Sequence, residues 1–276
     1  MRRIALAGGD SVPVLGLGTW GWGEDPGRRG DEIAALRTGI ELGLTLVDTA
    51  EMYGGGAAEE VLAEALAGHR DEVFVVSKVL PSNASRSGTV AACERSLERL
   101  STDRIDLYLL HWQGSHPVED TLAAFQQLVD DGKIRHWGVS NFDHTDLAKL
   151  EQVPGSEGLA TDQVLYNLSR RGPEYDLFPW CADHDLLVMA YSPIEQGRIL
   201  GDPTLGEVAA AHGISPAAAA LAWVLRRDGL CTIPKASSPE HVHDNAAALE
   251  VDLTREDLDA LDRAFPPAGP RPLEML

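Results

Sequence analysis

Three shortages in this 276-residue sequence exclude whole classes of protein. The three cysteines, Cys93, Cys181 and Cys231, are scattered and lack metal-ligand spacing, so we expect neither a disulfide framework nor a zinc site. Only 23 lysines and arginines stand against 43 aspartates and glutamates, and the formal net charge of -20 argues against nucleic acid and anionic membranes as partners. No run approaches ~18 apolar residues and no apolar leader follows Arg2 and Arg3, so we expect a cytoplasmic protein.

What the sequence does contain is a repeated unit: a short apolar run, a loop and a helical stretch. The runs are nearly continuous instead of alternating, which is typical of parallel strands buried on both faces. They lie at residues 14–17, 44–47, 73–76, 105–110, 134–139, 164–166, 187–191 and 231–233.

Helical periodicity occupies most of the intervals and continues past the last run. It covers residues 31–42, 59–66, 90–100, 118–129, 145–150, 217–227, 241–249 and 255–265. Ahead of the repeats, Gly8-Gly9-Asp10 between two apolar triplets predicts a β-hairpin that could plug the bottom of a barrel. Eight strand–helix units at this length predict an α/β fold. We expect a (β/α)8 TIM barrel, a single domain over residues 1–276, with an N-terminal β-hairpin and an extra C-terminal helix.

Ionisable residues end three consecutive expected strands. These are Asp48, Lys78 and His111, and Tyr53 lies in the loop after the second strand. Because strand ends meet at one rim of a barrel, we expect the four side chains to converge. Each alone has an ordinary interpretation, as a helix cap, a snorkelling surface lysine, a core histidine or an uninformative tyrosine. Their joint placement favours catalysis.

Such a set suits the reduction of a carbonyl group. A free tyrosine has a pKa of about 10, and an ammonium group ~4 Å away could lower it by up to about three units. Asp48 would hold Lys78, and a neutral His111 would donate a hydrogen bond to the substrate oxygen. Tyr53 would then be the general acid that protonates the carbonyl oxygen as hydride arrives.

One glycine motif is misleading. Gly16, Gly18 and Gly21 match the dinucleotide fingerprint G-x-G-x-x-G, which requires a helix to open at the third glycine. Here a loop follows, from Trp22 to Gly27. We therefore reject a Rossmann site at this position.

The motifs at the strand ends resemble those of the aldo-keto reductases almost from end to end. The matching stretches include L-G-L-G-T-W, L-V-D-T-A-E-M-Y-G, D-L-Y-L-L-H-W, G-V-S-N-F and I-P-K-A-S. The resemblance implies a barrel fold and NADPH-dependent reduction of aldehydes or ketones to alcohols. It also implies that Asp48, Tyr53, Lys78 and His111 form the catalytic tetrad.

The resemblance further implies a set of cofactor contacts for NADPH, with NADH as a second cofactor. Ser140, Asn141 and Gln163 would hold the carboxamide, and Tyr191 would stack on the nicotinamide. Lys235 would contact the 2′-phosphate. The full set expected is Gly18, Thr19, Trp20, Asp48, Ser140, Asn141, Gln163, Tyr191, Ser192, Pro193, Gly197, Lys235, Ser237, Ser238, His241, Asp244 and Asn245.

The chain departs from the family pattern in two ways. His241 stands where the family usually has an arginine, which weakens the expected hold on the 2′-phosphate. The loop of residues 112–118 and the tail of residues 266–276 are short, which predicts a shallow, open pocket for small activated carbonyls, dicarbonyls or aryl aldehydes. The residues expected to line it are Trp20, Met52, Tyr53, His111 and Trp112. No extra apolar stripe marks the expected outer helices, so we expect a monomer.

Three other functions stay open at this point. Lys78 could form a Schiff base in an aldolase, which leaves the cofactor residues without a role. A metal-dependent hydrolase is disfavoured and no metal ligands are expected, because His241 and His243 would face apart on a helix. The third is a nicotinamide-binding sensor with no important turnover.

Overall fold

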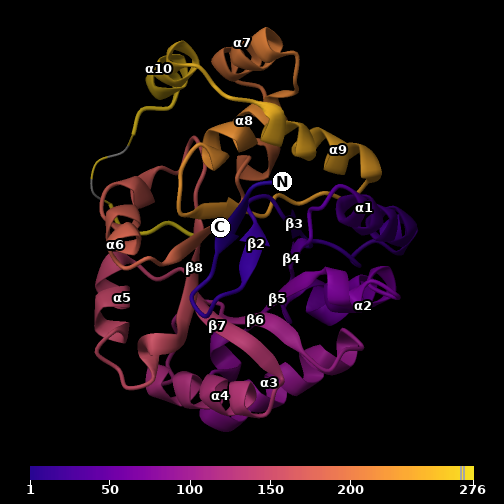
Figure 1. Ribbon diagram of the computed structural model, residues 1–276, viewed down its shortest axis with the longest axis vertical. Coiled ribbons are helices and arrows are strands. Elements are labelled where there is room, and N and C mark those ends of the chain that lie inside the picture. The colour runs from indigo at the N-terminus through magenta and orange to yellow at the C-terminus, as the bar shows by residue number, and fades with distance from the viewer. Residues whose placement is uncertain (268, 270) are drawn as a thin grey trace.

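In the computed structural model, which describes residues 1–267, 269 and 271–276, eight parallel strands form a closed barrel with helices outside it (Figure 1). Neighbours in sequence are neighbours in the sheet throughout. The strands are β3 (Leu17–Gly18), β4 (Leu46–Asp48), β5 (Phe74–Val79), β6 (Ile105–Leu110), β7 (Ile134–Ser140), β8 (Leu159–Leu165), β9 (Leu187–Tyr191) and β10 (Leu230–Thr232). The expected TIM barrel is confirmed.

The barrel closes through glycine. The backbone N–H of Gly16 donates to the carbonyl oxygen of Thr232 at 2.8 Å, and that of Gly18 donates to Pro234 at 3.0 Å. A Cβ on Gly16 would lie 2.5 Å from the carbonyl oxygen of Leu46, and one on Gly18 would lie 2.7 Å from that of Ile233. These glycines let β3 fit between β4 and β10, which explains the first two glycines of the misleading motif without a phosphate.

The helices follow the strands as the periodicity predicts, and their starts match the capping signals. Ser215 and Ser238 each cap a helix whose first residue is proline, and Thr254 forms a capping box with Asp257. The helices expected from sequence are α1 (Arg29–Glu41), α2 (Ala57–Ala65), α3 (Arg86–Arg99), α4 (Val118–Asp130), α5 (His144–Leu150), α8 (Pro216–Leu225), α9 (Pro239–Ala247) and the extra α10 (Arg255–Ala264).

Two helices escaped the sequence patterns, α6 (Leu177–Asp183) and α7 (Pro203–His212). Helix α6 is short and carries Pro179 in its first turn. Helix α7 has Gly206 in its interior. Its start did carry a signal, because Asp202 caps it and Pro203 is its first residue.

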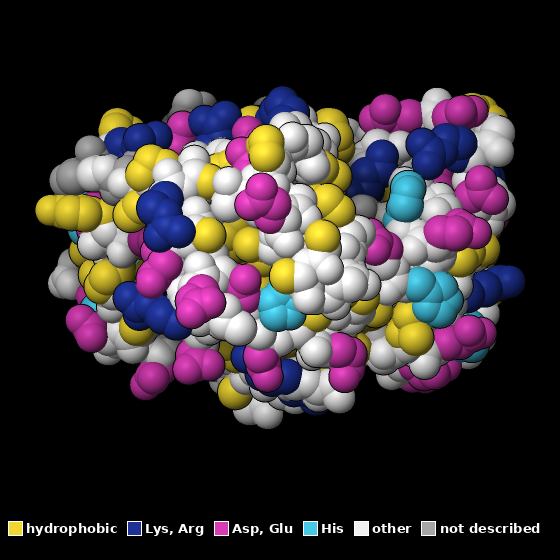
Figure 2. All heavy atoms as spheres, turned by 90° about the horizontal axis from the view of Figure 1, so that it is seen from above, with side chains coloured by type: hydrophobic (Ala, Val, Ile, Leu, Met, Phe, Trp, Pro, Cys, Tyr) yellow, Lys and Arg dark blue, Asp and Glu magenta, His cyan; other side chains and the backbone are white. Residues whose placement is uncertain are grey.

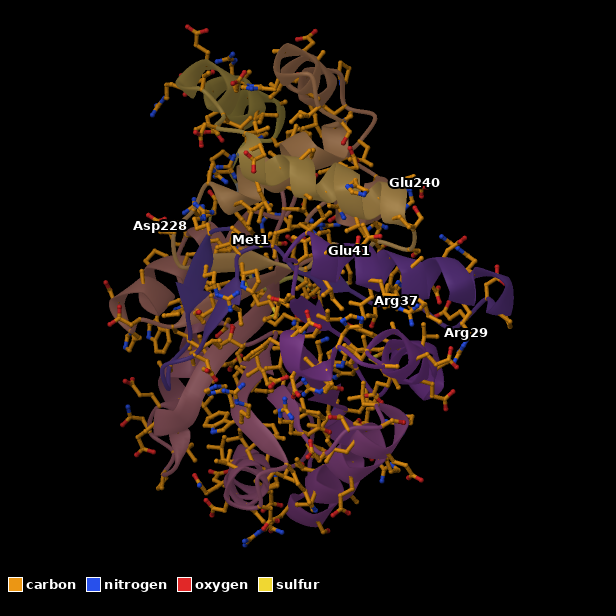
Figure 3. The ribbon with its side chains drawn as sticks, turned by 45° about the vertical axis from the view of Figure 1, so that its right-hand side comes forward. Met1, Arg29, Arg37, Glu41, Asp228 and Glu240 are labelled. Atoms are coloured by element: carbon orange, nitrogen blue, oxygen red, sulfur yellow. The ribbon has the colours of Figure 1, made fainter. Side chains whose placement is uncertain are left out.

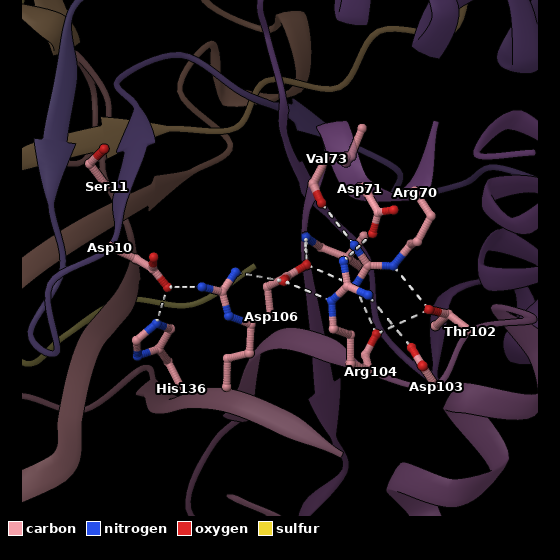
Figure 4. A network of polar contacts seen from close by, with 12 residues as sticks. Asp10, Ser11, Arg70, Asp71, Val73, Thr102, Asp103, Arg104, Asp106 and His136 are labelled. Carbon is pink, nitrogen blue, oxygen red and sulfur yellow. Dashed lines mark hydrogen bonds and ion pairs between the residues drawn. The ribbon is translucent and has the colours of Figure 1, made fainter. Parts of the chain in front are cut away.

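The hairpin of β1 (Arg3–Ala5) and β2 (Ser11–Pro13) closes the end of the barrel where the strands begin. Leu6 and Val12 pack into the cluster of side chains that fills the barrel interior. Asp10 pairs with Arg135 at 2.6 Å and with His136 at 2.7 Å, both on β7. Figure 4 shows this pairing continuing into a larger ionic network around Asp106. The interior is therefore open only at the strand carboxyl ends.

The outer surface carries the excess of acid. Figure 2 shows Asp and Glu spread over the face seen from above, with Lys and Arg in small groups among them. Among the described residues, no single helix is long and apolar enough to cross a membrane, although α7 and α8, bent by 87°, pass that test as a pair. Helix α8 is almost wholly buried against the barrel.

Candidate active site

The four side chains expected to be catalytic meet at the open end of the barrel. Lys78 lies on β5 with its Nζ atom 2.7 Å from the Oδ2 atom of Asp48, 3.1 Å from the Tyr53 hydroxyl and 2.8 Å from the carbonyl oxygen of Thr49. The rings of Tyr53 and His111 are 6.0 Å apart in an edge arrangement. Asp48, Lys78 and His111 are buried, at 2%, 0% and 8% exposure.

Burial and charge set the protonation of this cluster. Burial raises the pKa of Asp48, and the ammonium of Lys78 opposes that rise. Burial by itself would lower the pKa of Lys78, but Asp48 and Tyr53 raise it above its ordinary value. Lys78 is therefore a protonated amine. A buried ammonium without a free electron pair cannot form a Schiff base, so the aldolase interpretation loses its nucleophile.

The sequence led us to expect a lowered pKa for Tyr53, and only the contribution of Lys78 follows that direction. Burial raises the pKa of the Tyr53 phenol, and Lys78 only partly offsets that rise. The estimate from sequence counted the ammonium but not the loss of water around the hydroxyl. The phenol is therefore protonated at neutral pH, which is the form that a proton donor requires.

His111 is neutral. Burial and the charge of Lys78 lower its pKa to about 2. Its Nδ1 atom has no hydrogen-bond partner among the described residues. A neutral imidazole keeps one N–H to donate and one nitrogen to accept, as the sequence interpretation required.

A chain of hydrogen bonds extends the cluster across the barrel. The side-chain amide of Gln163 donates to the Oδ1 atom of Asp48 at 2.7 Å. The Ser140 hydroxyl donates to the carbonyl oxygen of Gln163 at 2.8 Å, and the Tyr191 hydroxyl donates to Asn141 at 2.9 Å. Asn141 has a left-handed backbone, φ 61°, a strained conformation that often marks a functional site.

Strand β8 shows why sequence alone shortened it. It was expected at residues 164–166, but it begins at Leu159. Thr161, Asp162 and Gln163 interrupt the apolar run, although all three are buried. Gln163 faces Asp48 in the barrel interior. Gln163, one of the polar residues that weakened the strand signal, is thus also a residue of the site.

A cavity of about 820 Å³ lies over the cluster, and most of the expected site residues line it. These are Gly18, Trp20, Asp48, Met52, Tyr53, His111, Trp112, Ser140, Asn141, Gln163, Tyr191, Ser192, Gly197, Lys235, Ser237, His241, Asp244 and Asn245. Lys78 is fully buried and is not one of the residues that line the cavity. Ile194 and Gln196, in the loop expected to border the cofactor, also line it, as do residues that sequence reasoning missed: Arg28, Leu200, Ser215, Pro216, Ala217, Ile233, Met275 and Leu276.

Three expected cofactor residues do not line the cavity. Thr19 is fully buried, and its backbone N–H donates to the carbonyl oxygen of Asp48 at 2.9 Å. Pro193 is buried in the loop after β9. Ser238 uses its hydroxyl to cap α9. In this structure each supports the backbone beside the cavity.

The short tail nevertheless reaches the pocket that was expected to be shallow and open. The tail folds back so that Met275 and Leu276 line the cavity. Arg170 holds the tail in place, since its Nη1 atom lies 2.6 Å from Glu274. Arg170 also pairs with Glu195 in the loop after β9, at 3.0 Å. This ionic contact therefore keeps the short tail beside the cavity.

The fold and the cluster together define a barrel oxidoreductase with a tyrosine–lysine–aspartate–histidine centre. Residues 14–265 match the model of the aldo/keto reductase family. The chain therefore belongs to the aldo/keto reductase family.

Individual relatives agree in length as well as in sequence. The methylglyoxal reductase YeaE of Escherichia coli K12 is 52% identical over 281 aligned residues, which cover 100% of this chain and 99% of YeaE. The glyoxal reductase of Bacillus subtilis 168 is 33% identical, with 99% and 97% covered. The crystal structure of an aldo/keto reductase from Klebsiella pneumoniae in complex with NADP and acetate superposes with a TM-score of 0.97, at 48% identity and 99% coverage of both chains.

Proposed function

We propose that the protein reduces small activated carbonyl compounds, with the dicarbonyl methylglyoxal as the first candidate, and that Tyr53 supplies the proton. Carbonyl reduction with NADPH follows from the family: the protein is an NADPH-dependent aldo/keto reductase. The observation that carries the proposal is the contact of the Lys78 Nζ atom with both Tyr53 and Asp48 beside a cavity of about 820 Å³.

The bound cofactor supplies a hydride to the carbonyl carbon. We propose that the Tyr53 hydroxyl gives its proton to the carbonyl oxygen as negative charge develops there. The Lys78 ammonium, 3.1 Å away, then stabilises the phenolate that remains. Asp48 balances the charge of Lys78 and fixes its position. A neutral His111 donates to the substrate oxygen and orients it toward Tyr53.

The chain's own residues fit the cofactor. Ser140, Asn141 and Gln163 present hydroxyl and amide groups at the strand ends for the carboxamide, and Tyr191 presents its ring. At the other end of the cavity, the Nδ2 atom of Asn245 is buried without a hydrogen-bond partner among the described residues. An unpaired buried donor is unfavourable by about 1–3 kcal/mol, so it indicates a ligand acceptor at that place.

The mouth of the cavity supports small substrates. Trp20 and Met52 are 52% and 41% exposed there, and Trp112 and Met275 also line it. Such a wall offers apolar contact and few polar groups, so recognition depends on the reactive carbonyl itself. The two relatives named for methylglyoxal and glyoxal point to the same substrate class.

The test measures loss of absorbance at 340 nm from NADPH, then from NADH, with methylglyoxal and a panel of aryl aldehydes. Tyr53→Phe should lower kcat by about 10²- to 10⁴-fold while leaving the affinity for NADPH unchanged. Tyr175→Phe, an exposed tyrosine outside the cavity, is the matched control. Full activity of Tyr53→Phe would refute the role of Tyr53, and absence of turnover with every carbonyl would leave a cofactor-binding sensor instead.

We further propose that residues 1–276 act as one domain, as a monomer in the cytoplasm. Cys93, Cys181 and Cys231 are free and buried, which suits a reducing compartment. Light scattering checks the monomer, and cell fractionation checks the location. A stable dimer or a secreted protein would refute these assignments.

A further inference from the structure

Two cations that line the cavity have no carboxylate partner among the described residues, and only one of them was expected. They are Arg28, which directly precedes α1, and Lys235, which follows β10. Within 4.0 Å of either, no Asp or Glu oxygen is present in the described part of the chain. In a protein with a formal net charge of -20, two cations that line one cavity and form no ion pair with the described residues indicate an anionic ligand.

Helix packing brings the two cations to the same place. Helices α1 and α9 pack side by side, and Figure 3 shows their amino ends on the same side of the molecule, marked by Arg29 and Glu240. Ser237, just before α9, and His241, in its first turn, line the cavity together with Lys235. Partial burial and then the charge of Arg28 lower the pKa of Lys235, and the charges of Glu32 and Glu24 only partly oppose this. The effect of Arg28 on Lys235 agrees with two cations placed at one part of the cavity.

His241 makes the position of Arg28 significant. An imidazole lacks the planar fork of five donors and the permanent charge of a guanidinium, so His241 cannot replace an arginine at this position. Arg28 is exposed, makes no hydrogen bond with the described residues through its side chain, and is free to turn toward a phosphate. The amino end of α9, with Asn245 buried and unpaired further along the same helix, adds backbone N–H groups and a positive dipole.

We propose that Arg28 binds the 2′-phosphate of NADPH together with Lys235 and so restores the selectivity for NADPH that His241 would otherwise weaken. This inference rests on the proposed function for its cofactor and goes beyond it in assigning the selectivity to a residue of the α1 side. The arginine then comes from the segment before α1 and not from the position of His241 on α9. The phosphate still contacts one lysine and one arginine, as in the family pattern.

The test compares Arg28→Gln with Arg37→Gln. Arg37 lies on α1, is exposed and has no acidic partner among the described residues, but it does not line the cavity. Arg28→Gln should raise the KM for NADPH about tenfold and leave the KM for NADH within twofold, whereas Arg37→Gln should change neither. Equal increases for both cofactors would assign Arg28 to the pyrophosphate and overturn the proposal, and so would no change for either.

A binding measurement separates this inference from the proposed function. Calorimetry with 2′,5′-ADP and with 5′-ADP does not depend on any carbonyl substrate. Arg28→Gln should weaken 2′,5′-ADP about tenfold and leave 5′-ADP unchanged, and Lys235→Met should do the same. If the wild type binds 2′,5′-ADP no better than 5′-ADP, the phosphate site is refuted even when turnover is observed. If that preference is present but no carbonyl is reduced, only the proposed substrate fails.

Discussion

A histidine that stays neutral in the folded protein makes stability depend on pH. The pKa of His111 is lowered from 6.5 to about 2, so the unfolded chain takes up a proton below pH 6.5 that the folded chain refuses. The contribution of His111 to the free energy of unfolding is therefore fully present above pH 6.5 and is lost as the pH is lowered. Between pH 6.5 and pH 4.5 this residue alone should remove about 2–3 kcal/mol from the free energy of unfolding.

His111→Asn isolates that contribution. Denaturant unfolding of both proteins at several pH values should show a flatter pH dependence for the variant over this window. Parallel curves for the two proteins would mean that His111 carries a normal pKa. His184→Asn, a change at the surface outside the cavity, serves as the control.

The buried ion pair of Lys78 and Asp48 predicts an asymmetry between single and double replacement. Lys78→Met leaves the Asp48 carboxylate buried without its cation, and should lower the free energy of unfolding by about 3–5 kcal/mol. Lys78→Met combined with Asp48→Asn should recover part of that loss, because no charge remains buried. Both variants should be inactive. A double variant less stable than the single one would contradict a pairing of this kind.

At the scale of elements, Arg170 connects two segments that both border the cavity. It pairs with Glu195 in the loop after β9, where Glu195 has φ 50° and is 4% exposed, and with Glu274 in the tail. Arg170→Ala should weaken NADPH binding and destabilise the fold by about 1–3 kcal/mol, since the buried Glu195 carboxylate loses one charged donor and keeps only those from Asn167 and Arg198. Glu274→Gln releases only the tail and should raise the KM for the carbonyl substrate about two- to fivefold. Steady-state kinetics with each substrate varied in turn distinguish the two effects, and identical effects would refute separate roles.

Elements also show how far the sequence alone could lead. Strands β6 and β9 lie where their apolar runs predicted, because both faces of each strand are buried. Strand β8 and helix α6 could not be delimited, since buried polar groups and Pro179 contradict the local pattern and only tertiary partners compensate. The strand-end residues converged as the barrel requires. Arg28 and the tail were missed because their positions depend on packing between segments far apart in sequence.

At the scale of the whole molecule, one barrel with one interior should unfold as one unit. Near- and far-ultraviolet circular dichroism should give coincident thermal transitions. NADPH at about 100 times its Kd should stabilise the protein by about 2.7 kcal/mol, and both transitions should shift together. Two separated transitions would contradict a single domain over residues 1–276.

The closure of the barrel between β3 and β10, at Gly16 and Gly18, has a consequence for how the chain folds. The backbone N–H of Gly16 donates to Thr232, which lies near the end of the chain. The barrel therefore cannot close during synthesis until nearly all of the polypeptide has left the ribosome. Until then β3 and β10 are unpaired edge strands that can pair with other chains. Nascent protein is most exposed to misassociation in that interval, and a methyl group at position 16 would prolong it.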